Sequence, residues 1–524
     1  MILVDGSSRY KSKSRFLGPT AIVAYVALAD FVIHMLIANN YGYFRDELYY
    51  IVSGQHLALG YVDFPPVIAF LAAILGFISN DSLISIHFVS ALVGAAIVFM
   101  AGMICKELGG GVRAQVLAAV ATVFSAAFAV SSIFSMDVID MLWWTVLAYL
   151  LVKIIKSDNE RPKLWLYFGV IAGVGLMTKL TIVFFLLALL VGVAFSFALI
   201  SKRKSLLRSK WLWVGGLISF AFLLPYIFWN AANGFPTVDF YIHHGGLNGG
   251  GPVSFLAYQA LIANPIGLLL SILGLVFFFR SKVGRAFSAL GLAYIILLVV
   301  FTLMNGKPYF IMGAYPFLFA AGAVLVEGAT KQRRRLLGYV GYLTVILLVG
   351  SGLAPLYAPV LPPQVFVSSY GSLTGVGNGA AAQQTSGQFP QYLGDRFGWD
   401  TMVATVAQVY HALPTSEQSQ ACILTLNYGE ASALIFLGKS YDLPRVISGH
   451  NNFYIWGPQG CSGSVLIAVG YDLSDIQAHY GNVTVGGTVN CNYCMNDENG
   501  LPVLVATSPI GSLQSEWSSV KHFD

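Results

Sequence analysis

The sequence predicts a polytopic α-helical membrane protein that carries a small α/β domain at its C-terminal end. Of its 524 residues, 56% are hydrophobic and only 10% are charged, whereas a soluble protein carries roughly 25% charged residues. About eleven apolar stretches lie before residue 355, and a more polar sequence with mixed charges follows residue 390. We therefore expect the first two thirds of the chain to lie in a membrane.

Eleven apolar stretches are candidate membrane spans, because several of them match the roughly 20 residues that a helix needs to cross a bilayer. They lie near residues 17–39, 85–105, 114–132, 138–155, 164–178, 181–200, 211–229, 254–279, 287–304, 309–327 and 336–354. The first is too long for a signal peptide and lacks a small-residue cleavage site, so we expect a signal anchor. The segment 65–79 is shorter and begins with two prolines, which predicts an interfacial or re-entrant helix.

The basic residues predict the orientation of these spans. If the N-terminus is inside, 22 of the 29 Lys and Arg fall in inside segments, as the positive-inside rule demands. They are Arg9, Lys11, Lys13, Arg15, Lys106, Arg113, Lys153, Lys156, Arg161, Lys163, Lys202, Arg203, Lys204, Arg208, Lys210, Arg280, Lys282, Arg285, Lys331, Arg333, Arg334 and Arg335. We expect a multi-pass protein of the cell membrane with a cytoplasmic N-terminus and, because the span count is odd, an extracytoplasmic C-terminal domain.

Three cations are exceptions to this distribution. Before the C-terminal region, the outside face keeps only Arg45, Lys179 and Lys307, and each lies at the end of a predicted span. Cations at the outer membrane face could bind a phosphate at headgroup depth. Lysines that extend from helix ends toward water are the alternative.

The composition divides the chain into a transmembrane domain over 1–355, a linker or mobile loop over 356–390, and an extracytoplasmic α/β domain over 391–524. The linker is rich in Pro, Gly, Ser, Ala and Gln. In the last domain we expect buried strands at 421–427, 464–470 and 502–507, and helices at 401–413 and 430–437.

Four of the five cysteines lie in this last domain, where disulfides are permitted if it is extracytoplasmic. They are Cys422, Cys461, Cys491 and Cys494, whereas Cys105 lies at the inner end of a span and is expected to be a reduced thiol. The C-x-x-C pair Cys491–Cys494 has no second pair or histidines beside it, so one or two disulfides are a better prediction than zinc. The connectivity stays open.

Carboxylates gather where the spans meet the outside face. Asp46 and Glu47 are adjacent just after the first span, and Asp63 follows in the same loop. Asp137 and Asp140 begin another span, and their spacing of three residues places both near one helix face. Such acids at a membrane boundary cost desolvation energy, so they could activate a hydroxyl or hold a metal. For Asp137, a favourable charge at a helix N-terminus is the alternative.

No Walker loop, dinucleotide fingerprint or H-E-x-x-H motif is present, so the energy for a reaction must arrive with the substrate. A group donor linked to a lipid phosphate meets this need, because cations can stabilise a departing phosphate.

Several motifs together resemble glycosyltransferase family 39, a GT-C group that includes protein O-mannosyltransferases and the lipid A aminoarabinose transferases. These motifs are Phe44-Arg-Asp-Glu-Leu-Tyr-Tyr50, Gly60-Tyr-Val-Asp-Phe-Pro-Pro66, Met136-Asp137, Thr178-Lys179 and Gly306-Lys-Pro-Tyr309. Leu426-Asn-Tyr-Gly-Glu-Ala-Ser-Ala433 and Ser448-Gly-His-Asn-Asn-Phe453 are similar to the C-terminal region of bacterial members. The resemblance covers nearly the whole chain.

The resemblance implies a GT-C fold, a polyprenyl-phosphate sugar donor, and transfer on the outer face to a lipid, glycan or protein acceptor. Asp46 matches the catalytic base, which deprotonates the acceptor hydroxyl so that it attacks the anomeric carbon, with inversion. Glu47 would help to position the acceptor or a metal. Arg45, Lys179, Lys307 and Tyr309 are candidates for the donor phosphate, and Asp63, Asp137 and Asp140 for the cavity and the acceptor. We assign no metal ligands and no certain cofactor, leave a divalent metal open, and expect no nucleic-acid partner.

One position departs from the family pattern. Relatives carry His or Lys before the two prolines, and this chain has Phe64. A cation or metal ligand is thereby lost, which weakens the case for a metal near Asp63. Two alternatives stay open: a flippase or transporter for lipid-linked sugars, and a binding protein that has lost activity. A transporter would hold its charges near the bilayer midplane on broken helices, whereas here they gather at the outer span ends.

Overall fold

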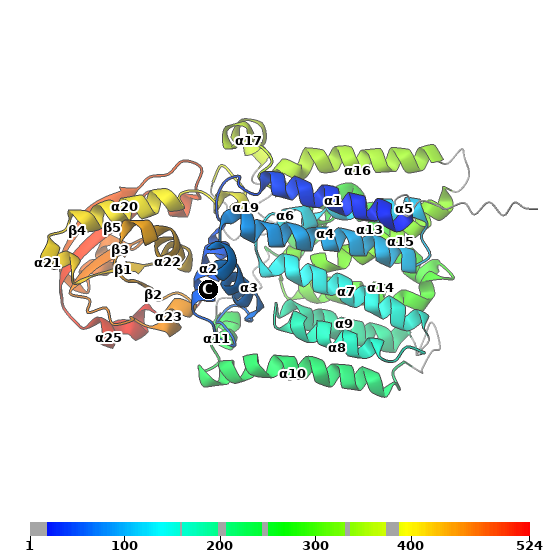
Figure 1. The fold of residues 1–524 in the computed structure, drawn as a ribbon, viewed down its shortest axis with the longest axis horizontal. Coiled ribbons are helices and arrows are strands. Elements are labelled where there is room, and N and C mark those ends of the chain that lie inside the picture. The colour runs from blue at the N-terminus through cyan, green and yellow to red at the C-terminus, as the bar shows by residue number, and fades with distance from the viewer. Residues whose placement is uncertain are drawn as a thin grey trace, which may run out of the picture.

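The computed structural model describes residues 18–157, 160–196, 206–243, 250–330, 336–373 and 387–523. A bundle of long helices forms one end of the molecule and a five-stranded sheet with its helices forms the other (Figure 1). Between them lie the short helices α2 (Arg45–Gln55), α3 (Val67–Ser79) and α11 (Pro236–His243).

Seven helices in the described ranges are long and apolar enough to cross a membrane, or up to eight if one bent pair is counted as a span. They are α1 (Pro19–Ile37), α4 (Leu83–Glu107), α7 (Met136–Lys156), α10 (Lys210–Ala232), η3 with α14 (Gly284–Leu303), η4 with α15 (Pro308–Ala329), and α16 (Leu336–Tyr357). On α10 and α16, side chains such as Leu217, Phe228 and Leu348 are mostly exposed, as expected for helices that face lipid. The polytopic helical fold is confirmed.

The remaining predicted spans are also helical but are shorter or broken. They are α5 (Val112–Val123) with α6 (Ala126–Val130), α8 (Leu164–Leu176), α9 (Thr181–Phe195), and α12 (Pro252–Ile262) with α13 (Pro265–Arg280). The last pair bends by 99° because Pro265 begins α13 and the Asn264 side chain accepts a hydrogen bond from the Ile266 N–H. The count of eleven spans therefore stays a prediction.

The helices of the bundle pack closely where glycines face a neighbouring backbone. A Cβ added at Gly322 of α15 would stand 2.0 Å from the carbonyl oxygen of Leu270 on α13, and one at Gly274 would stand 2.3 Å from that of Leu318. Small residues that let helix backbones approach are typical of membrane bundles.

The C-terminal domain is built on a mixed sheet in the order β2-β1-β3-β5-β4. The strands are β1 (Ala421–Thr425), β2 (Val446–Ser448), β3 (Val465–Val469), β4 (Tyr480–Val489) and β5 (Leu501–Pro509). Strands β2, β1 and β3 are parallel, with Ile423 opposite Val446 and Ile467, and β5 and β4 continue the sheet antiparallel. Three of these strands correspond to those expected from the sequence.

Alternate side chains of the sheet enter two cores. Ile423 and Ile467 face α20 (Trp399–Ala412) and α22 (Tyr428–Phe436) in a core that is continuous with the bundle. Leu424 and Leu466 face a second core with Trp517.

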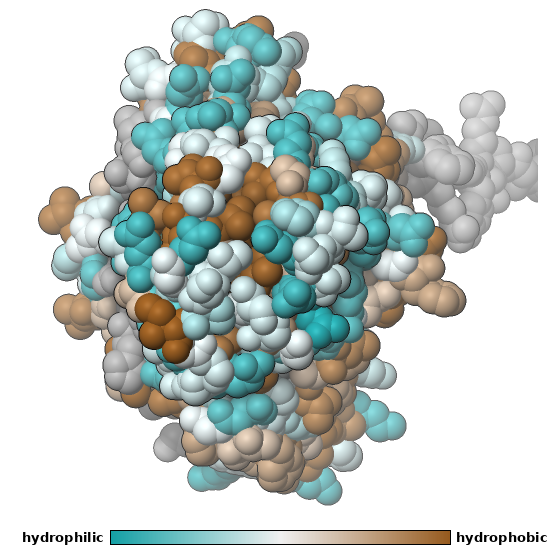
Figure 2. Space-filling model, turned by 90° about the vertical axis from the view of Figure 1, so that its left-hand side faces the viewer, coloured by the Kyte–Doolittle hydropathy of each residue, from teal (hydrophilic) through white to brown (hydrophobic). Residues whose placement is uncertain are grey.

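Short helices complete this end of the chain. They are α17 (Pro363–Tyr370), η6 (Gly371–Leu373), α19 (Gln391–Gly394), α21 (Thr415–Gln418), η7 (Leu437–Tyr441), α23 (Asn452–Trp456), α24 (Leu473–Gln477), η8 (Asn496–Glu498), α25 (Leu513–Glu516) and η9 (Trp517–Val520). Hydrophilic and intermediate residues cover most of the surface at this end (Figure 2).

Two disulfides complete the domain. Cys422 on β1 pairs with Cys461, and Cys491 pairs with Cys494, which settles the connectivity that the sequence left open. Cys105 is a buried free thiol.

Candidate active site

A cavity of about 750 Å³ lies between the helical bundle and the sheet domain. The bundle side contributes Phe44, Arg45, Asp46, Asp63, Ala126, Ala129, Val130, Ile133, Ser135, Asp137, Phe240, Leu261, Ile262, Lys307, Tyr309, Met312, Leu356 and Tyr357. The segment 391–392 and the sheet domain contribute Gln391, Tyr392, Leu426, Asn427, Tyr428, Glu430, His450, Gly470, Asp497, Leu501 and His522. Charged and apolar groups therefore face one shared cavity.

Asp46 lies in the first turn of α2, where the helix dipole favours a negative charge. Its Oδ1 accepts a hydrogen bond of 2.8 Å from the Tyr428 hydroxyl, which the sheet domain supplies. Burial raises the pKa of Asp46 above its ordinary value, while Arg45 and the hydrogen bond from Tyr428 act in the opposite direction. A carboxylate of raised pKa that faces a cavity is suited to accept a proton.

Arg45 also lines the cavity, but nearby carboxylates already balance its charge. Its Nη2 lies 3.2 Å from Oδ2 of Asp395, and its guanidinium lies 5.6 Å from the centre of the Tyr428 ring. The pKa of Arg45 stays above its ordinary value because Asp395 and further acidic groups outweigh the effect of burial. Arg45 is therefore tied to the C-terminal segment as well as to the cavity.

Lys307 is the cation of the cavity that has no ion-pair partner among the described residues. It precedes η4, and Tyr309 of the same turn lines the cavity beside it. Burial lowers the pKa of Lys307, and the charge of Lys179 lowers it further. An unpaired ammonium group in such a place is suited to bind an anion.

Lys179 and Asp137 form an ion pair with each other, and only Asp137 lines the cavity. The Lys179 ammonium group lies 4.9 Å from the centre of the Tyr309 ring, behind the cavity wall. Asp140 does not line the cavity either: it is 6% exposed and accepts hydrogen bonds from Trp144 Nε1 and Thr181 Oγ1. Because α7 turns about 100° per residue, Asp137 and Asp140 lie near one face but reach different surroundings.

Asp63 lines the cavity, and its Oδ1 accepts a hydrogen bond of 3.1 Å from the Tyr49 hydroxyl. Burial raises the pKa of Asp63 to about 7. Phe64 does not line the cavity. It is 1% exposed and stacks on Tyr61, with the ring centres 4.7 Å apart. The residue that departs from the family pattern is therefore part of the packed core and not of the cavity surface.

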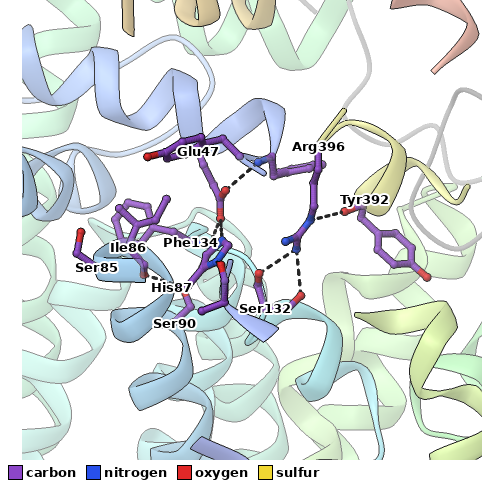
Figure 3. A network of polar contacts seen from close by, with 12 residues as sticks. Glu47, Ser85, Ile86, His87, Ser90, Ser132, Phe134, Tyr392 and Arg396 are labelled. Atoms are coloured by element: carbon purple, nitrogen blue, oxygen red, sulfur yellow. Dashed lines mark hydrogen bonds and ion pairs between the residues drawn. The ribbon is translucent and has the colours of Figure 1, made fainter. Parts of the chain in front are cut away.

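Glu47 is fully buried and does not line the cavity (Figure 3). Its Oε1 accepts hydrogen bonds from His87 Nε2 at 2.9 Å and from the Phe134 N–H at 2.6 Å, and its Oε2 accepts one from the Phe44 N–H. The other ring nitrogen of His87 faces the carbonyl oxygen of Ala38 at 2.5 Å. Both nitrogens thus face acceptors, and the contact between His87 and Glu47 is buried. The role in substrate positioning that the sequence predicted stays untested.

A second buried contact anchors the start of the sheet domain. Arg396, just after α19, donates from Nη2 to the carbonyl oxygen and hydroxyl of Ser132 in the loop before α7 (Figure 3). Asp395, its neighbour, holds Arg45. The segment 395–396 thereby joins the bundle and the domain at the cavity.

From the sequence alone, we did not identify the residues of the sheet domain that line the cavity as part of the site. Several of these residues follow the carboxyl ends of the parallel strands: Leu426, Asn427 and Tyr428 after β1, His450 after β2, and Gly470 after β3. Ligands bind at this edge in many open α/β sheets. The N-x-x-E capping box at Asn427, directly after a buried strand, is the signal that could have located it.

The described residues contain no group of three or more His, Cys, Asp or Glu side chains that could hold a metal ion. The oxygens of Glu47 are already engaged with protein donors. We therefore derive no step through a metal.

Residues 63–229 match the family model described as dolichyl-phosphate-mannose-protein mannosyltransferase. No curated protein matches the sequence. The structure resembles ArnT from Cupriavidus metallidurans bound to undecaprenyl phosphate, with a TM-score of 0.61 and 14% identity over 93% of this chain and 98% of that one. It also resembles the oligosaccharyltransferase AglB from Archaeoglobus fulgidus, in complex with an inhibitory peptide and a dolichol-phosphate. That TM-score is 0.50, at 11% identity over 80% of this chain and 64% of AglB.

These comparisons establish the fold. The chain has the fold of the GT-C glycosyltransferases, in the arrangement seen in ArnT, and is a multi-span membrane protein. At these identities the likeness shows the fold, and the chemistry must be argued from the cavity.

The buried contacts of Glu47 predict how stability depends on pH. Burial alone would raise the pKa of Glu47, but His87 and the N–H of Phe134 lower it below the ordinary 4.5. The carboxylate therefore stabilises the fold above about pH 4.5, and this contribution is lost as the pH falls through the lower folded pKa. We expect Glu47→Gln to lose about 3 kcal/mol at neutral pH, measured as a lower thermal midpoint in nanodiscs. The gap to wild type should narrow progressively as the pH falls below the ordinary 4.5.

Glu107→Gln is the matched control, because Glu107 pairs with Lys156 at a more exposed site. It should cost less than about 1 kcal/mol. An equal effect of both variants at neutral pH would contradict the structural role of Glu47.

Proposed function

We propose that the protein is an integral-membrane glycosyltransferase that moves a sugar from a polyprenyl-phosphate donor to an acceptor hydroxyl or amine. Asp46 is the base, and the reaction takes place on the extracytoplasmic face of the cell membrane. The observation that carries this proposal is the single cavity in which the Asp46 carboxylate and the Lys307 ammonium group both lie, the latter without an ion-pair partner among the described residues. The orientation rests on the distribution of Lys and Arg in the sequence.

The lining of the cavity fits a lipid-linked phosphate. One part is apolar and comes from the membrane bundle: Ala126, Ala129, Val130, Ile133, Leu261, Ile262, Met312 and Leu356. Lys307 and Tyr309 lie on the same side. A prenyl chain would occupy the apolar part with its phosphate at Lys307, in keeping with the undecaprenyl phosphate bound to the similar ArnT.

The reaction follows from these positions. Asp46 takes the proton from the acceptor, the acceptor oxygen or nitrogen attacks the anomeric carbon, and the bond from that carbon to the phosphate oxygen breaks. Lys307 stabilises the departing lipid phosphate. Tyr428 holds Oδ1 of Asp46, which leaves Oδ2 to receive the proton.

The assignment of the base is tested with Asp46→Asn. Asparagine keeps the size of the side chain but cannot accept the proton, so we expect transfer from radiolabelled polyprenyl-phosphate sugars to membrane acceptors to fall by at least about 100-fold. The binding of undecaprenyl phosphate should change little, because Asp46 does not hold the phosphate. Transfer at the wild-type rate would show that Asp46 is not the base.

The pH profile tests Asp46 and Lys307 together. Activity requires an ionised Asp46, so it falls as the pH drops through a pKa that lies above the ordinary 3.8. It also requires a charged Lys307, so it falls as the pH rises through a pKa that lies below 10.5. We expect a bell-shaped profile of kcat/KM against pH. Its two limbs should lie closer together than the ordinary pKa values of 3.8 and 10.5.

The control is Lys307→Arg, which keeps the charge but has a pKa above 12. It should move the alkaline limb upward and leave the acid limb in place. An alkaline limb that does not move would contradict the phosphate role of Lys307.

A further inference from the structure

The two walls of the cavity differ in charge. The bundle side carries both cations, Arg45 and Lys307, together with three acids, whereas the sheet-domain wall presents only the acids Glu430 and Asp497 among its Lys, Arg, Asp and Glu residues. None of the described residues on that wall is Lys or Arg. A phosphate held at Lys307 therefore faces a wall that would repel a second anion and attract hydrogen-bond donors.

Glu430 caps α22 through one of its two carboxylate oxygens. Its Oε2 accepts a hydrogen bond of 3.0 Å from the Asn427 N–H, which caps α22. Its Oε1 lies toward Gly470, where an added Cβ would stand 2.8 Å away. Gly470 has no side chain and, like Glu430, lines the cavity, so this edge of Glu430 forms part of the cavity wall.

Glu498 is a second buried carboxyl group whose charge acts on Glu430. Glu498 is 3% exposed and accepts a hydrogen bond of 3.2 Å at Oε1 from the Asn427 amide. Its Oε2 has no hydrogen-bond partner within the part of the chain that the structure describes. Burial and their mutual charge raise the pKa of Glu430, and burial raises that of Glu498. A carboxyl group with a raised pKa gains a proton more readily, and its protonated form donates a hydrogen bond as well as accepting them.

Aromatic and amide groups surround this pair. The Tyr428 and His450 rings lie 4.9 Å apart, and His522 lies 4.5 Å from His450, with its Nε2 fixed at the carbonyl oxygen of Leu426. Carboxyl and amide groups beside aromatic rings suit a ligand that has hydroxyls on its edge and C–H groups on its face. A sugar ring has this form.

We propose that the strand-end wall of the sheet domain, formed by Asn427, Tyr428, Glu430, His450 and Asp497, is a subsite that binds the hydroxyl groups of a sugar ring. It rests on the proposed function, and the sugar belongs either to the donor or to a glycan acceptor. Glu430 is the principal hydrogen-bond acceptor, and the subsite excludes substrates that would place an anion there.

Glu430→Gln tests this subsite with little risk to the fold, because glutamine keeps the capping box. Full-length protein in nanodiscs is titrated with a panel of neutral methyl glycosides by saturation-transfer NMR. We expect the bound glycosides to lose about tenfold or more in affinity, as for the loss of a buried hydrogen bond. Asp497→Asn, on the cavity surface, should weaken the same glycosides. The control Asp475→Asn, at an exposed position of α24, should have no effect.

Two lipid probes identify the source of the sugar. If Glu430→Gln weakens undecaprenyl phosphate mannose but not undecaprenyl phosphate, the subsite holds the donor sugar. If both lipids bind as to wild type while glycoside binding is lost, it holds a glycan acceptor. The proposal is overturned if the glycosides bind both variants as tightly as they bind wild type. It is also overturned if no glycoside binds the wild-type protein. Failure of wild type to bind either lipid would instead count against the proposed function.

Discussion

The site depends on how α2 is held at the edge of the membrane bundle. Three consecutive charged residues begin this helix, and successive side chains on a helix point about 100° apart. Arg45 therefore reaches Asp395 of the C-terminal segment, Asp46 faces the cavity and Tyr428, and Glu47 enters the bundle to meet His87. The contacts of Arg45 and Glu47 on either side fix the rotation of the helix, and with it the direction of the Asp46 carboxylate between them.

The same contacts join the two parts of the molecule. The sheet domain supplies the hydroxyl that holds Asp46, and the segment 395–396 reaches both α2 and the loop before α7. The cavity therefore exists only when the domain is seated on the bundle. Of the three cations, Arg45 and Lys179 are paired with carboxylates. Lys307 has no ion-pair partner among the described residues and is therefore the cation available to a ligand.

The sequence predicted the helical membrane fold and the C-terminal sheet because both depend on local patterns of apolar residues. It also placed Asp46, Asp63, Asp137, Arg45, Lys307 and Tyr309 near one face, and all six line one cavity. The family resemblance gave Asp46 and Glu47 different roles, but the sequence did not show which of the two is buried, because this depends on helix rotation and on distant partners such as His87 and Phe134. For the same reason it could not show that Asp140 turns into the bundle, or that Tyr428 reaches Asp46 from 382 positions away.

The central claim is that a lipid phosphate and the Asp46 carboxylate share this cavity. The most direct measurement is a cryo-electron microscopy map of the full-length protein in nanodiscs with undecaprenyl phosphate. The account predicts the phosphate within about 4 Å of Lys307 Nζ, the prenyl chain along α6 and α12, and Asp46 facing the open side of the phosphate. A phosphate bound outside the cavity, or one held by Lys179 with the Lys179–Asp137 pair broken, would contradict it.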